Sequence, residues 1–178
     1  MALKRLVIDG FGQLELNNVA FRRDGRVEAQ CKLADGIDFV ENGMLLAIDN
    51  VTRTVAMPGK NDNYIGLNYS SEHMYDERTP GLKNFKLEKD SFLPRLGYLS
   101  RGDKFTTNCI AYDSSDFADD DTLKAVELTG TNAQTLYGQP CELGAIQVTK
   151  TAPTANGLLV IAKTTMPDGQ FAFKFQQL

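Results

Sequence analysis

The side chains best suited to acid–base chemistry gather around His73, the only histidine of the chain. Glu72, Asp76 and Glu77 flank it, and a neighbouring carboxylate can orient an imidazole for general-base work or share a metal ion with it. The sequence has no nucleophile elbow, phosphate-binding loop or dinucleotide fingerprint to accompany this group. We therefore interpret His73 as a surface residue that makes an ordinary hydrogen bond.

The three cysteines, Cys31, Cys109 and Cys141, are the candidate nucleophiles. They are widely separated and odd in number, whereas a disulfide scaffold has an even number and a zinc site has close pairs. Cys31 and Cys109 alternate onto apolar faces and should be buried, while the position of Cys141 stays open. Because the reactive species is an accessible thiolate, we expect reduced thiols, no cofactor and no enzymatic activity.

An acidic loop runs from Asp113 to Asp121 and holds five aspartates in nine residues. Calcium takes several carboxylate oxygens, often from one loop, but this spacing lacks the Gly and Glu positions of an EF-hand. We favour a solvated acidic loop over a cation site, and the sequence leaves the choice open.

The tripeptide Arg101-Gly102-Asp103 is the one that integrins bind. Three residues recur by chance, and this sequence is also well suited to a turn that precedes a strand. We favour the turn over an adhesion motif.

Charge and hydropathy exclude two partner classes. With 19 Lys and Arg against 23 Asp and Glu, the net charge of −4 leaves no basic footprint for nucleic acid. No apolar run approaches the roughly 20 residues of a membrane span, and the N-terminus lacks a secretory apolar region. We therefore expect no nucleic acid, no membrane, and a soluble protein kept in a reducing cytoplasm.

Two segments predict β-hairpins. Residues 44–57 place β-rich runs on either side of Asp49-Asn50, and residues 158–175 do so around Pro167-Asp168-Gly169. In the last run, Phe171, Phe173 and Phe175 should face one side and anchor it in a core or an interface.

Further strands follow from alternation and from turn residues. The segment 122–128 can be a strand or a short helix, and we favour the strand because of its β-branched residues. Pairing should be antiparallel, since tight turns leave no room for crossover helices. The remaining predicted strands are Arg5–Asp9, Gln13–Phe21 with a bulge at Asn17-Asn18, Val27–Leu33, Lys104–Tyr112 and Gly144–Lys150.

Residues 58–102 differ from the rest, because Pro, Gly and Asn interrupt short apolar groups. Such a segment is usually functional or reaches a neighbour. We predict an all-β fold, an antiparallel β-barrel or β-sandwich with a long irregular middle segment. Residues 1–178 form one β domain or two small β modules, with 1–57 and 103–178 as the body and 58–102 as an arm or insertion. The aromatics of the middle segment are core filler or interface anchors: Tyr64, Tyr69, Tyr75, Phe85, Phe92 and Tyr98.

Several phrases of the chain resemble structural proteins of tailed bacteriophages, in particular auxiliary capsid proteins, the cement or decoration proteins. They are Glu41–Asp49, Arg101–Asn108 and the terminal hairpin 158–175, in a chain rich in Thr, Asn and Gly. The resemblance implies a barrel-like body, often a homotrimer, that binds major capsid protein on the outer surface of the shell. It also implies location in the virion after synthesis in the host bacterial cytoplasm.

On this hypothesis, residues 2–9 or the 58–102 segment contact the capsid. A phage tail, neck or baseplate component would share the composition. A carbohydrate-binding module is a further alternative, in which Tyr64, Tyr69 and Tyr75 would form stacking platforms.

Overall fold

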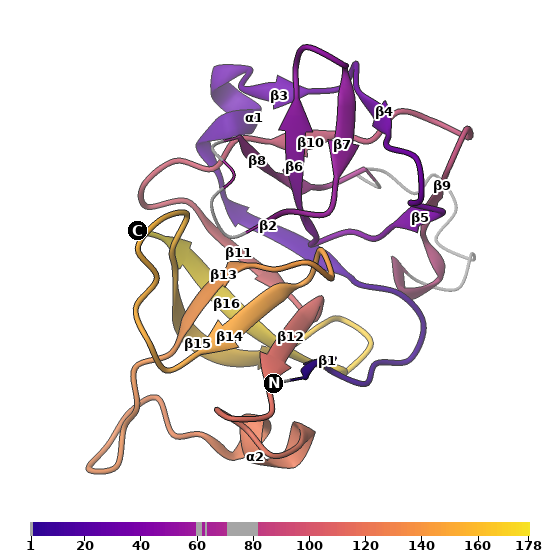
Figure 1. The fold of residues 1–178 in the computed structure, drawn as a ribbon. Coiled ribbons are helices and arrows are strands. Elements are labelled where there is room, and N and C mark those ends of the chain that lie inside the picture. The colour runs from indigo at the N-terminus through magenta and orange to yellow at the C-terminus, as the bar shows by residue number, and fades with distance from the viewer. Residues whose placement is uncertain (1, 60–61, 63, 71–81) are drawn as a thin grey trace.

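The computed structural model describes residues 2–59, 62, 64–70 and 82–178, and this part of the chain is mainly β (Figure 1). The described strands form an eight-stranded, a six-stranded and a two-stranded sheet. The largest sheet is open, with β1 (Leu3–Arg5) and β2 (Leu14–Asn18) at its edges. The predicted mainly β fold is confirmed, and of the two architectures the sandwich fits, because no sheet of the described residues closes into a barrel.

The eight-stranded sheet contains the C-terminal half of the chain and both of its N-terminal strands. Between the edge strands β1 and β2 its order is β12 (Ile110–Asp113), β14 (Ile146–Thr149), β13 (Tyr137–Pro140), β15 (Leu158–Thr165), β16 (Phe171–Gln177) and β11 (Lys104–Thr107).

The six-stranded sheet combines residues 27–56 with the middle segment. Strands β8 and β10, from residues 58–102, lie between β3 and β6, so the described part of that segment is built into a sheet. The number of domains stays a prediction. The order is β3 (Val27–Glu28), β10 (Leu96–Gly97), β8 (Ile65–Asn68), β6 (Leu45–Asp49), β7 (Thr54–Ala56) and β4 (Lys32–Leu33); β5 (Phe39–Val40) pairs with β9 (Leu87–Glu88).

Both predicted hairpins are present. β6 and β7 pair antiparallel, and Asp49 Oδ1 closes their turn by accepting hydrogen bonds from the Val51 and Thr52 amides at 2.8 and 3.2 Å. β15 and β16 form the second hairpin, in which Phe173 and Phe175 are buried. Alternation and turn chemistry were sufficient signals for these elements.

The expected strand over residues 122–128 is wrong, because the chain forms helix α2 (Asp120–Ala125) there. The Asp119 carboxylate caps the helix by accepting hydrogen bonds from the Thr122 amide at 2.8 Å and its hydroxyl at 2.6 Å. Two further aspartates lie in the first turn, where the helix dipole favours negative charge. With Leu123 buried, capping and packing outweigh the β propensity of the segment.

Two predicted strands are each divided into two. Residues 27–33 yield β3 and β4, which pair with different strands, and the Glu28 carboxylate accepts from the Gln30 amide between them at 2.6 Å. Residues 104–112 yield β11 and β12, because the chain turns at Asn108, where its carbonyl accepts from the Ile110 amide at 2.9 Å. Local hydrogen bonds end both runs although the apolar alternation continues.

The N-terminal strands are shorter than predicted. β1 ends at Arg5 because side chains take over the next amides, as when Asp120 Oδ2 accepts from the Val7 amide at 3.0 Å. β2 ends at Asn18, before the short helix α1 (Ala20–Asp24). The predicted bulge is confirmed, because the β2–β11 register shifts by one residue between Glu15 and Asn18.

Purely antiparallel pairing is also wrong, since β12 with β14 and β4 with β7 are parallel pairs. The chain between β12 and β14 contains α2 and β13, which supplies the length that a parallel crossover requires. The tight-turn argument missed this because it considered only neighbouring strands.

The interior has two hydrophobic clusters. The aromatic cluster contains Phe21, Phe105, Phe117, Phe173 and Phe175 among its buried members, and the thiol cluster contains all three cysteines with small aliphatic residues. Strand β12 separates them, because Ile110 and Tyr112 belong to the first and Ala111 to the second. Within the described residues, no helix has the length and apolar character needed to span a membrane.

Candidate functional site

The structure limits what the sequence-predicted candidates can do. His73 and its carboxylate neighbours lie among residues 71–81, outside the described part of the chain, so their role stays a prediction. Tyr75 lies in the same range.

All three cysteines are buried and free of disulfides, which confirms the prediction for Cys31 and Cys109 and settles Cys141. Arg5 Nη2 lies 3.5 Å from Cys109 Sγ, yet burial outweighs this cation and raises the thiol pKa to about 12. Burial likewise raises the pKa of Cys141 to about 11, and its Sγ donates to the Ala145 carbonyl at 3.0 Å. Both are therefore neutral thiols at physiological pH and poor nucleophiles.

The aspartates of residues 113–121 serve local structure. Asp119 caps α2, and Asp120 accepts hydrogen bonds from the Tyr112 hydroxyl at 2.7 Å and from the Val7 amide. Asp113 Oδ1 accepts from the Ser115 amide at 2.9 Å. Among the described residues, which include this whole loop, no three His, Cys, Asp or Glu side chains group as metal ligands.

The tripeptide 101–103 forms the turn before β11 that the sequence predicts. Asp103 is buried, and its two carboxylate oxygens accept hydrogen bonds from the Ala20 and Ser100 amides, both at 2.8 Å. The carboxylate that an integrin would bind is therefore part of the core, and the adhesion alternative does not fit this structure.

A buried polar site that the sequence did not predict is centred on Glu41. The Arg5 guanidinium donates to both oxygens of the Glu41 carboxylate at 2.7 Å, and the Gly12 amide donates to Oε2 at 2.7 Å. The Asn68 side chain donates to the Glu41 carbonyl at 2.8 Å. We call these four residues the Glu41 junction. Because it ties β1 to β8 and two loops with satisfied hydrogen bonds, it is a structural site.

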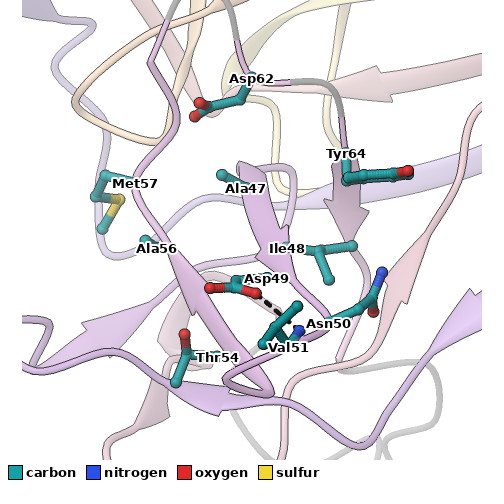
Figure 2. A pocket seen from close by; sticks show the side chains of 10 residues that line it. All are labelled: Ala47, Ile48, Asp49, Asn50, Val51, Thr54, Ala56, Met57, Asp62 and Tyr64. Atoms are coloured by element: carbon teal, nitrogen blue, oxygen red, sulfur yellow. Dashed lines mark hydrogen bonds between the residues drawn. The ribbon is translucent and has the colours of Figure 1, made fainter.

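The largest surface hollow of interest is a groove of about 590 Å³ over the β6–β7 hairpin (Figure 2). Ala47, Ile48, Ala56 and Met57 supply its apolar lining. Figure 2 shows Asp49 towards the hairpin turn and Asp62 at the other end. Asn50, Val51, Thr54 and Tyr64 complete the wall. We call this hollow the hairpin groove.

A second, smaller hollow of about 370 Å³ lies on the other side of Met57, where Pro58 and Gly59 form part of its wall. Asp113, Glu142 and Gln147 supply its polar groups, and Cys141 lies at its buried side. Because this thiol is neutral and hydrogen-bonded, the hollow lacks an activated nucleophile.

The tyrosines proposed as stacking platforms do not act together. Tyr64 is 61% exposed and lines the hairpin groove, whereas Tyr69 is buried against Phe21 with ring centroids 5.1 Å apart. Tyr69 is thus core filler, and the described residues offer one ring of the three to a ligand.

A different exposed apolar feature is the pair Phe92 and Leu93, which are 81% and 50% exposed. The turn before them is fixed, because Glu88 accepts hydrogen bonds from the Ser91 amide at 3.2 Å and the Ser91 hydroxyl at 2.5 Å. Pro94 after them is buried and leads into β10. The pair is therefore presented to solvent from a structured base.

Comparison with protein-family models, with curated proteins and with solved structures finds no match to this chain.

Proposed function

We propose that this chain is a non-enzymatic structural protein that binds the outer surface of a phage capsid lattice and stabilises it. The phage assignment rests on the resemblance of its sequence phrases. The single structural observation that supports a binding role is the exposed Phe92–Leu93 pair. Adjacent solvent-exposed Phe and Leu side chains are typical of protein interfaces, where aromatic anchors supply much of the binding energy.

The geometry of this pair suits an anchor. The preceding turn is held by hydrogen bonds to Glu88, and the following Pro94 is buried, so little backbone freedom is lost when a partner binds. Such preorganisation lowers the entropic cost of association. The pair belongs to residues 58–102, one of the two segments proposed to contact the capsid.

The N-terminal segment offers a second contact. β1 pairs with β12 at the edge of the eight-stranded sheet, and Val7 beyond it is exposed. An edge strand can accept a strand from a partner chain. Deleting this segment would also remove Arg5 from the Glu41 junction, so a point substitution at Val7 is the cleaner test.

A decoration protein stabilises its shell by mass action, because it binds the assembled lattice and not the separated subunits. Trimeric attachment at a symmetry axis would multiply the effect through effective concentration. Neither step requires catalysis, which agrees with the neutral, buried thiols.

The proposal is tested by co-sedimentation of the purified protein with expanded empty phage capsids. We expect saturable binding, and the Phe92→Ala/Leu93→Ala double variant should bind at least tenfold more weakly. Leu178→Ala, which truncates an apolar side chain of similar exposure elsewhere, is the control.

Failure of the wild-type protein to sediment with capsids would overturn the proposal. Rings or tubes of the protein alone in light scattering would favour a tail, neck or baseplate component instead. Equal binding by wild type and the double variant would remove residues 92 and 93 from the interface, and Val7→Asp would then test the N-terminal segment.

A further inference from the structure

The hairpin groove combines three features that suit one type of side chain. Its floor is aliphatic, its wall includes the exposed ring of Tyr64, and a carboxylate lies towards each end (Figure 2). Among the described residues that line it, none is a Lys or an Arg. The groove therefore carries negative charge beside apolar surface, with no described cation to balance it.

Both carboxylates are held by the backbone. Asp49 Oδ1 accepts from the amides of its own turn, and Asp62 Oδ2 accepts from the Gly59 amide at 2.6 Å. Hydrogen bonds from Thr52 and Val51 lower the pKa of Asp49, so this group is ionised at neutral pH. In each case the printed bonds occupy one carboxylate oxygen, which leaves the other able to accept from a ligand.

We propose that the hairpin groove binds Lys or Arg side chains of an extended segment on the partner protein. The aliphatic stem of such a residue packs on Ala47, Ala56 and Met57 while its charged head reaches a carboxylate. The Tyr64 ring adds a cation–π contact. This inference rests on the proposed function, because it specifies the chemistry of the partner's contact segment.

A neutral sugar fits the groove less well. Sugar sites use aromatic faces for stacking, and Tyr64 is the one described ring here because Tyr69 is buried in the aromatic cluster. Two carboxylates beside aliphatic side chains favour a cationic ligand with an apolar stem instead.

The direct test uses peptides without any capsid. Ac-Ala-Arg-Ala-Arg-Ala-NH2 is titrated into the ¹⁵N-labelled protein, with Ac-Ala-Gln-Ala-Gln-Ala-NH2 and a set of neutral oligosaccharides as comparison ligands. We expect saturable amide shifts at Ala47, Ala56 and Tyr64 with the arginine peptide alone. Raising the salt from 50 to 300 mM should weaken binding several-fold, since exposed ion pairs are screened.

Asp49→Asn/Asp62→Asn should weaken arginine-peptide binding at least tenfold. Asparagine retains an oxygen that can accept the same backbone hydrogen bonds, so the turns are preserved. The matched control is Asp121→Asn/Glu127→Gln, which makes the same change in net charge. Asp121 belongs to α2 and Glu127 follows it, and α2 lies at the far end of the molecule from the β6–β7 hairpin (Figure 1).

Equal binding of the arginine and glutamine peptides, or shifts with an oligosaccharide instead, would overturn the inference. Lys60 lies outside the described residues, so Lys60→Ala is included. Arginine binding that occurs only in this variant would mean that the chain's own lysine fills the groove, which also overturns the inference.

The two proposals can fail separately. If wild type and Asp49→Asn/Asp62→Asn bind capsids equally, the proposed function stands and the groove inference is wrong. If the arginine peptide binds the groove but the protein ignores capsids, the groove inference stands as peptide recognition and the capsid proposal is wrong.

Discussion

The aromatic cluster and the thiol cluster lie on opposite faces of β12 and are built differently. Large rings fill the first, where Phe173 contacts the rings of Phe171 and Phe175 at 5.0 and 6.2 Å between centroids. The second contains small aliphatic residues and neutral thiols, and the Glu41 junction reaches it through Arg5 and Cys109. Stability on one face thus depends on packing, whereas on the other it also depends on buried hydrogen bonds.

The surface divides in a related way. The hairpin groove and the Phe92–Leu93 pair both belong to the part of the chain that forms the two smaller sheets. The eight-stranded sheet holds the C-terminal hairpin and most of the phenylalanines of the aromatic cluster. We infer that one region mainly supplies stability and the other mainly supplies contacts, and substitutions should separate the two.

The largest expected effect is on packing. Phe173→Ala should lower the free energy of unfolding by about 4 kcal/mol, because it leaves a cavity in the aromatic cluster. Phe92→Ala, which truncates the same residue type on the surface, should leave it unchanged. Urea unfolding of both variants measures the contrast, and a similar loss in each would break the division between the regions.

The Glu41 junction should rank second. Glu41→Gln should cost about 3 kcal/mol in urea unfolding, since it leaves the partly buried Arg5 guanidinium without its counter-charge. The exposed Asp35–Lys89 pair is the control, and Asp35→Asn should have no measurable effect. If Glu41→Gln were as stable as wild type, the junction would not support the thiol-cluster side of the molecule.

Asp103 should have a smaller effect. Asp103→Ala should lower stability by about 2 kcal/mol, because the Ala20 and Ser100 amides lose a charged acceptor. Arg101→Ala, in the same turn but exposed, should be neutral in the same thermal or urea unfolding assay. A neutral Asp103→Ala would mean that water replaces the carboxylate and that the turn is not tied to the core.

The smallest effect is a pH dependence from the thiol cluster. Burial raises the pKa of Cys109 from its ordinary value near 9 to about 12, so folding favours the neutral thiol. Its contribution is complete below pH 9 and is lost between about pH 9 and 12 as the unfolded state ionises. Between pH 8 and 10 the loss should be about 1 kcal/mol.

Cys109→Ala should show a shallower decline over the same pH range, which urea unfolding at several pH values measures. Parallel curves for the two proteins would mean that this thiol is not held neutral by the fold.

Local patterns predicted the parts of the fold that depend on neighbouring residues. The hairpins over 44–57 and 158–175 followed from alternation and turn residues, and the bulge followed from Asn17-Asn18. Helix α2 was missed because its cap, Asp119, was counted as loop charge and its β-branched residues were given more weight. The parallel pair of β12 and β14 depends on a long crossover that no local window contains.

The candidate sites were harder to predict because they bring together distant residues. Arg5 and Glu41 are 36 residues apart, and Asn42-Gly43 after Glu41 indicated only a turn. Tyr64 reaches the hairpin groove because β8 pairs with β6, placing Ile65 beside Ala47. Alternation does not specify which strands pair, so the sequence named Asp49 and Tyr64 without bringing them together.

The measurement that tests the central claim most directly is calorimetry of expanded empty phage capsids with and without saturating wild-type protein. A protein that binds the assembled lattice must raise the temperature at which the capsid comes apart, and Phe92→Ala/Leu93→Ala should raise it less. An unchanged transition temperature at saturating protein would contradict the claim that this chain stabilises a capsid.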